Sequence, residues 1–205
     1  MAVTMEPEQA PRLFDRPEGT PDPLEGLARQ LLIEIGEDPD REGLADTPRR
    51  YAKWWREFIG YEAGKTETLF DSISDNQLVY VSGMLVWSLC EHHLLPFNCN
   101  LTIAYRSDKN LLGLSKFARI AHKHAHRLQV QERLVSDVAG EIAEITGSED
   151  VAVIGRGEHL CMTMRGIRTP ALMTSSAFRG AFEGNGPERT QLLMLAQNSA
   201  GSASH

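Results

Sequence analysis

The chain has 205 residues, of which 41% are hydrophobic and 24% charged, and its formal net charge is −7. This length and composition are typical of a globular protein with one domain of ordinary size. The acidic balance argues against a nucleic-acid partner, because nucleic-acid binders carry a broad basic surface. A local cluster of cations can still bind a small polyphosphate.

Neither a membrane span nor an export signal is expected. The sequence has no run of about 18 apolar residues, and its first residues lack the basic-then-apolar layout of a secretory signal. The three cysteines, Cys90, Cys99 and Cys161, are too few for a disulfide framework. We therefore expect a cytoplasmic protein with no membrane partner, whose reduced thiols can bind a metal.

Composition and periodicity divide the chain into four segments. Residues 1–23 contain five prolines and several acidic residues, so we expect a disordered arm. Residues 24–60 are predicted to form a helical extension and residues 61–196 the main folded domain. Residues 197–205 are predicted to be a flexible tail.

Two helices are predicted in the extension. The first runs from about Leu24 to Ile35, with apolar residues on one face. The second has Thr47 as its N-cap and Pro48 at the first helical position, and it ends at Gly60.

The main domain alternates between strands and helices. A strand from Leu78 to Leu89 contains Gly83, which indicates a bulge. Ser115 is predicted to cap a helix, and another helix follows it. Further strands are predicted at residues 100–106, 151–154, 159–164 and 171–178, and Pro187 begins a final helix. This order indicates an α+β fold, an antiparallel sheet with helices on one face.

A metal site is the strongest local signal. Cys90 and His93 lie three residues apart, and a distant His159-Leu160-Cys161 supplies further thiolate and imidazole groups, which Zn²⁺ prefers. Two arrangements are open. Four ligands including His159 would make a closed structural site, whereas Cys90, His93 and Cys161 alone would leave a position free for catalysis. Cys99 falls in a strand pattern and is expected to be an inert core thiol.

A second histidine cluster comprises His122, His124 and His126. His122 and His126 share a helical face, but the neighbouring cations would repel a metal. We interpret this cluster as a solvated or interface surface.

Several cations lie where a phosphate would bind. Ser115, Lys116 and Arg119 fall in the first turn of a predicted helix, where free N–H groups and the helix dipole attract anions. Arg50 and Lys53 repeat this pattern on one helical face. Further cations near the metal motif are Arg165 and Arg168.

Four segments together resemble the GTP cyclohydrolase I family. They are SLCEHHLLPF, GLSKFARI, RLQVQERL and EHLCMTMRGI, and they occur in that family's order. The resemblance covers about residues 25–195. It implies a tunnelling fold (T-fold), a four-stranded antiparallel sheet with two helices on one face, as the catalytic domain over residues 61–196. It also implies a toroidal homodecamer with active sites between subunits.

The resemblance assigns roles to matching residues. It implies Zn²⁺ held by Cys90, His93 and Cys161, which selects the open arrangement. His92, His159 and Ser115 then match catalytic groups. The implied substrate-binding residues are Glu132, Gln131, Lys116, Arg119, Arg165, Arg50 and Lys53.

The implied reaction converts GTP and water to 7,8-dihydroneopterin 3'-triphosphate and formate. A carboxylate such as Glu132 can accept two hydrogen bonds from guanine N1–H and N2–H₂. Two alternatives remain open from the sequence. The chain can be a T-fold sibling acting on a related purine or pterin, or a non-catalytic zinc protein with a closed four-ligand site.

Overall fold

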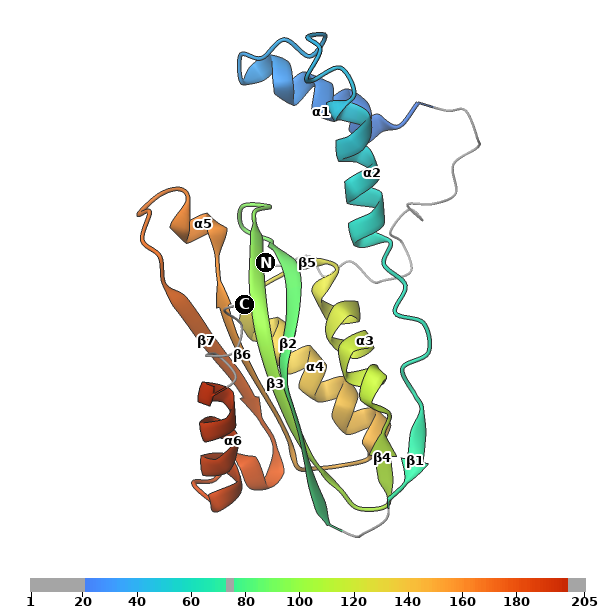
Figure 1. Cartoon of the computed structure of the whole chain (residues 1–205), viewed down its shortest axis with the longest axis vertical. Coiled ribbons are helices and arrows are strands. Elements are labelled where there is room, and N and C mark those ends of the chain that lie inside the picture. Colours follow the sequence, from blue (N-terminus) through green and yellow to red (C-terminus); the bar gives the residue numbers. More distant parts are fainter. Residues whose placement is uncertain (1–20, 73–75, 199–205) are drawn as a thin grey trace, which may run out of the picture. The chain divides into compact units, whose positions relative to one another are not determined.

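The computed structural model describes residues 21–72 and 76–198. The chain divides between Tyr61 and Glu62 into two compact units, which are described separately (Figure 1). Residues 1–20 of the predicted arm and residues 199–205 of the predicted tail lie outside the described residues. No helix among the residues described has the length and apolar character needed to cross a membrane.

The first unit contains two helices, α1 (Pro23–Glu34) and α2 (Thr47–Ile59). Asp22 caps α1 by accepting a hydrogen bond from the Leu24 N–H at 3.0 Å, and it forms an ion pair with Arg56 of α2 at 2.9 Å. This pair ties the start of one helix to the last turn of the other. The predicted N-cap is wrong by one residue, since Asp46 precedes the helix and Thr47 is its first residue.

The second unit is built on a five-stranded sheet with the order β5-β2-β3-β6-β7. Four strands pair in antiparallel order along the sheet, namely β2 (Gln77–Cys90), β3 (Pro96–Ser107), β6 (Val151–Glu158) and β7 (Leu172–Phe178). The short β5 (Leu128–Gln129) runs parallel to the end of β2 and was not predicted. Strands β1 (Leu69–Asp71) and β4 (Asn110–Leu112) form a separate pair. The predicted α+β class is confirmed.

Gly83 interrupts β2 as the sequence indicated. The pairing of β2 with β3 shifts between Val81 and Met84, and Gly83 has a φ of 78°. This left-handed conformation is easily adopted only by glycine. The predicted bulge is confirmed.

Helices α3 (Leu114–Ala125) and α4 (Gln131–Thr146) cover one face of the sheet (Figure 1). Phe117 and Ile120 of α3, with Leu134 of α4, pack on sheet residues such as Ile103 in the larger buried core. Because strand side chains alternate, the next residue, Ala104, faces the other side. There it packs with residues of the short η2 (Gly180–Phe182) and of α6 (Pro187–Asn198), whose first residue is the predicted Pro187.

Two further local predictions are wrong. Ser115 does not cap α3, because Gly113 precedes the helix and Leu114 is its first residue. Residues 159–164 are not a strand, because β6 ends at Glu158 and the chain turns into the short helix α5 (Leu160–Thr163). The pairing of β6 with β7 ends where Glu158 meets Leu172, so the next residues have no continuous neighbouring strand.

Candidate metal centre

The turn between β2 and β3 presents the first two candidate ligands. Cys90 ends β2, and its carbonyl accepts hydrogen bonds from Leu94 N–H at 2.8 Å and His93 N–H at 3.3 Å. Leu94 has a φ of 55°, a left-handed conformation that is uncommon for a residue with a side chain. The turn therefore folds tightly enough to bring Cys90 and His93 together.

The third candidate ligand comes from the far end of β6. Phe97 and His159 form an isolated β-bridge, after which the chain bends into α5 and carries Cys161 back toward Cys90. The ligand atoms of Cys90, His93 and Cys161 all lie within 4.8 Å of one another. Cys90 is buried, Cys161 half-buried and His93 exposed.

The chemistry of this group fits a bound metal. Burial raises the pKa of Cys161, and the neighbouring Cys90 thiol raises it further. Two adjacent thiols resist becoming two thiolates unless a cation compensates the charge. A thiolate–imidazole–thiolate set can hold a transition metal.

His159 does not join this group. Its Nε2 lies 3.0 Å from Gln131 Oε1, and its ring stacks on Phe97 with 4.5 Å between ring centroids and 4° between ring planes. Burial lowers the pKa of His159, while the carboxylate of Glu132 raises it. Among the described residues, the structure thus brings three ligands together and holds His159 beside them.

Gln131 lies in a closed interior position. It is the first residue of α4, its exposed fraction is 0%, and its amide bonds to strands β6 and β7. The Gln131 side chain is thus engaged within the protein, and its predicted contact with the substrate stays a prediction. Its neighbour Glu132 is exposed in the same first turn.

An ion pair joins the metal turn to this helix. Arg133 donates to both carboxylate oxygens of Glu91, at 2.7 and 3.1 Å, which lowers the pKa of Glu91. The Nδ1 atom of His92 lies 3.7 Å from the sulfur of Cys90. The turn, His92 and the start of α4 thus form one side of the site.

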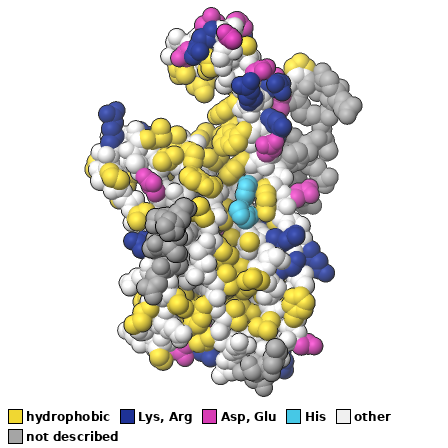
Figure 2. Space-filling view, in the orientation of Figure 1, with side chains coloured by type: hydrophobic (Ala, Val, Ile, Leu, Met, Phe, Trp, Pro, Cys, Tyr) yellow, Lys and Arg dark blue, Asp and Glu magenta, His cyan; other side chains and the backbone are white. Residues whose placement is uncertain are grey.

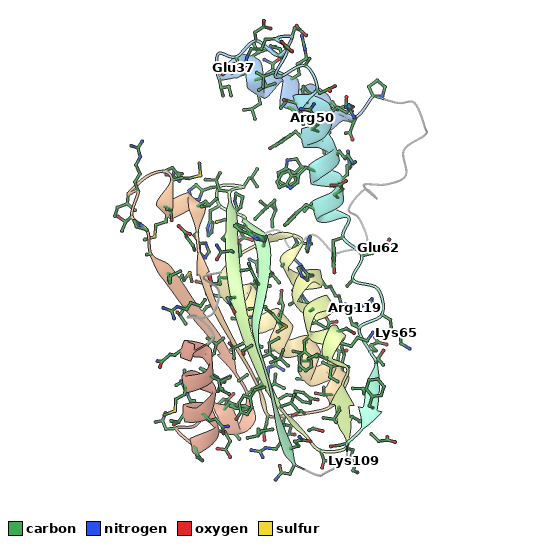
Figure 3. All side chains as sticks on the ribbon, in the orientation of Figure 1. Glu37, Arg50, Glu62, Lys65, Lys109 and Arg119 are labelled. Carbon is green, nitrogen blue, oxygen red and sulfur yellow. The ribbon has the colours of Figure 1, made fainter. Side chains whose placement is uncertain are left out.

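Most of the residues predicted to bind phosphate lie away from the metal group. The last residue of α3 comes shortly before β5, whose Gln129 pairs with Cys90 at the metal end of the sheet. The first residue of α3 follows β4. Ser115 therefore lies about 15 Å along the helix from the metal end, at 1.5 Å per residue. Lys116 Nζ donates to the Lys65 carbonyl and Arg119 Nη1 to the Ala63 carbonyl, both at 2.9 Å. Figure 3 shows Arg119 and Lys65 on the side of α3 near the segment leading to β1.

The remaining predicted cations fall into two groups. The charge of Arg165 acts on Cys161 and lowers its pKa, so this side chain lies near the metal group. Arg168 lies three residues farther along the chain, and its backbone has the left-handed φ of 52°. Arg50 and Lys53 lie on α2 in the first unit, where they pair with Asp46 at 3.2 Å and Glu57 at 3.5 Å.

The second histidine cluster forms no metal group. His124 Nε2 lies 2.6 Å from Glu141, which also accepts a hydrogen bond from Lys123 at 2.9 Å. His126 Nδ1 lies 2.8 Å from the His122 carbonyl. His124 is half-buried in polar contacts with α4, so it is not fully solvated, and the predicted interface role of the cluster stays a prediction.

Sequence reasoning missed two groups in the site, Phe97 as the stacking partner of His159 and the Glu91–Arg133 ion pair. Phe97 is buried at the start of β3 and looks like an ordinary core residue. Glu91 and Arg133 belong to separate motifs, and no periodicity connects them. Only the packing of α4 against the β2–β3 turn reveals their pairing.

The comparisons with known proteins point to one family. Residues 24–197 match the family described as GTP cyclohydrolase I. A relative named GTP cyclohydrolase 1 from Hyperthermus butylicus is 48% identical over 78% of this chain and 82% of its own length. Relatives of the same name from Corynebacterium aurimucosum and Deinococcus radiodurans are 44% and 41% identical, covering 85% and 86% of this chain and 92% and 84% of their own lengths.

The metal group makes a direct prediction about the three cysteines. Cys161→Ala should remove the metal, because two remaining ligands cannot hold it tightly. Cys99→Ala is the matched control, since Cys99 is buried and its pKa is raised to about 12, so it is a packing thiol. Metal per chain, measured by elemental analysis of the purified variants, should fall for Cys161→Ala and stay unchanged for Cys99→Ala. Equal metal content in both variants would contradict the assignment of Cys161 as a metal ligand.

Proposed function

Because this chain belongs to the GTP cyclohydrolase I family and is an enzyme of that type, we propose that it converts GTP and water to 7,8-dihydroneopterin 3'-triphosphate and formate, with Zn²⁺ as its cofactor. The observation that carries this proposal is the Cys90–His93–Cys161 group beside a half-buried His159 that hydrogen-bonds to Gln131. Three ligands suit a catalytic metal, which keeps one position for reaction.

The donor set favours Zn²⁺. Two thiolates and one imidazole match the ligands that zinc takes in proteins, and carboxylates are absent from the group that the described residues form. When bound, Zn²⁺ supplies a water molecule activated for attack at neutral pH.

Glu132 is proposed to hold the guanine. It is exposed in the first turn of α4, and its charge raises the pKa of His159, so it lies near this ring. A carboxylate there can accept hydrogen bonds from guanine N1–H and N2–H₂ together. This contact would place the imidazole part of the base toward the metal group.

His159 and His92 are proposed to move protons. His92 Nδ1 lies 3.7 Å from the sulfur of Cys90, His159 lies two residues from Cys161, and a neutral imidazole offers both a proton donor and an acceptor. A protonated histidine that donates its proton to N7 of the guanine makes C8 more electrophilic, and the neutral imidazole left behind can accept a proton in a later step.

The separated cations support sites formed between chains. Ser115, Lys116 and Arg119 lie along α3 away from the metal group of their own chain, so we propose that a neighbouring copy supplies them to the ribose and triphosphate. Arg165 is proposed to bind the triphosphate from the metal side, and Arg50 and Lys53 from the helical extension.

Exposed apolar residues also favour assembly. Leu85, Trp87 and Leu172 are 54%, 50% and 61% exposed on the second unit. Figure 2 shows hydrophobic side chains over the face of this unit that is turned to the viewer. Large apolar surfaces of this kind are typical of interfaces. We propose a homo-oligomer, a decamer of T-fold subunits.

The guanine contact makes a prediction about Glu132. Glu132→Ala should lower kcat/KM for GTP by about 100-fold or more, because two charge-assisted hydrogen bonds are lost. Zinc content should not change. The control is Glu144→Ala, an exposed glutamate farther along the same helix, which should keep wild-type kinetics.

The assay is formate release from GTP, with and without a chelator. Chelation should stop the reaction of the wild-type enzyme. Normal kinetics of Glu132→Ala would refute the guanine contact, and a wild-type enzyme that releases no formate from GTP would refute the proposed function.

Sites between chains predict complementation of two inactive variants. One chain carries Cys161→Ala and the other Ser115→Ala with Lys116→Ala, and the two are co-expressed. Random co-assembly should restore activity to about a quarter of the wild-type level, because a quarter of two-chain sites receive both intact halves. Each variant expressed alone should stay inactive. Complete absence of complementation in verified mixed oligomers would show that one chain supplies the whole site.

A further inference from the structure

The amide of Gln131 can have only one orientation. Its Nε2 lies 3.0 Å from the Gly155 carbonyl, 3.2 Å from the Met173 carbonyl and 3.0 Å from Ser175 Oγ. Carbonyl oxygens accept hydrogen bonds and cannot donate them, so the nitrogen must face these two carbonyls. The oxygen Oε1 must therefore face His159.

This orientation fixes the tautomer of His159. Its Nε2 lies 3.0 Å from Gln131 Oε1, which can only accept, so Nε2 carries a hydrogen. In the neutral ring the other nitrogen, Nδ1, then has the free lone pair. Nδ1 has no hydrogen-bond partner among the residues that the structure describes.

The surroundings hold both side chains in place. Phe97 is fully buried and stacks on one face of the His159 ring. Gly157 lies next to the amide, where an added Cβ would come 3.0 Å from Gln131 Oε1 and would collide with the Asn98 carbonyl oxygen. The stacking on Phe97 favours one position of the His159 ring, and the two backbone carbonyls that accept from the amide favour one orientation of Gln131.

We propose that Gln131 is a positioning residue that holds His159 in its Nε2–H form, so that Nδ1 is the atom that exchanges protons with the substrate. This inference rests on the proposed function and deepens it. It gives the buried Gln131 side chain an action through His159 in place of the predicted direct contact with the substrate.

A purely structural role is the competing explanation. The same amide connects α4 to β6 and β7, so its loss also weakens the fold. The two roles differ in one respect. A positioning residue affects turnover only while His159 is present, whereas a structural residue affects turnover in any background.

The test is a double-mutant cycle on kcat with GTP in the zinc-loaded enzyme. Gln131→Met keeps the length of the side chain but removes the acceptor, and it should lower kcat by about 100-fold, within the range that acid–base groups contribute. In a His159→Ala background the same substitution should change kcat by less than about threefold. Zinc content and KM should stay near their wild-type values in both backgrounds.

Two further variants keep the test independent of folding. Gln131→Glu retains an oxygen toward His159 but places its second oxygen against two carbonyls, so it should lower the melting temperature and keep most of the turnover. Ser175→Ala removes one partner of the amide and should change kcat by less than about threefold. Across these variants kcat should therefore depend on whether residue 131 presents a hydrogen-bond acceptor to His159. It should not correlate with the melting temperature.

Additive losses in the cycle, or turnover that falls in step with melting temperature across the variants, would overturn the inference in an active enzyme. Failure of the proposed function would appear differently, because the wild-type enzyme would then release no formate from GTP.

Discussion

The pairing register of β2, β3 and β6 is the constraint on which the rest of the site depends. Leu89 pairs with Pro96 across the β2–β3 turn, and Asn100 pairs with Arg156 one strand farther on. This register places the turn carrying Cys90 and His93 at the same end of the sheet as His159. A slip of one residue would reverse the faces of a strand and separate the ligands. The buried core between the sheet and helices α3 and α4 holds that register.

The strongly patterned parts of the fold were predictable from the sequence. The long β2 with its bulge, both covering helices and the final helix after Pro187 follow from periodicity and from glycine and proline positions. The predicted strand at residues 159–164 failed for a tertiary reason. His159-Leu160-Cys161 alternates like a strand, but the pairing with β7 stops at Glu158, and the chain coils into α5 instead. The two-residue β5 is too short to leave a periodic signal.

The site was predictable in its chemistry and less so in its geometry. Thiolate and imidazole groups at Cys90, His93 and Cys161 are recognisable by residue type and spacing, and the structure brings them together. Whether His159 would be a fourth ligand could not be decided from spacing. That choice depends on Gln131 and Phe97, which contact the ring from α4 and β3. Neither residue type indicates such a contact by itself.

In the proposed mechanism the metal group and the buried amide of Gln131 form one arrangement, in which Gln131 keeps His159 available for proton transfer and away from the metal. X-ray absorption of the zinc-loaded protein tests this most directly. We expect two sulfur neighbours at about 2.3 Å and one imidazole nitrogen at about 2.0 Å, with the same spectrum from His159→Ala. A second imidazole that disappears in His159→Ala would contradict the account.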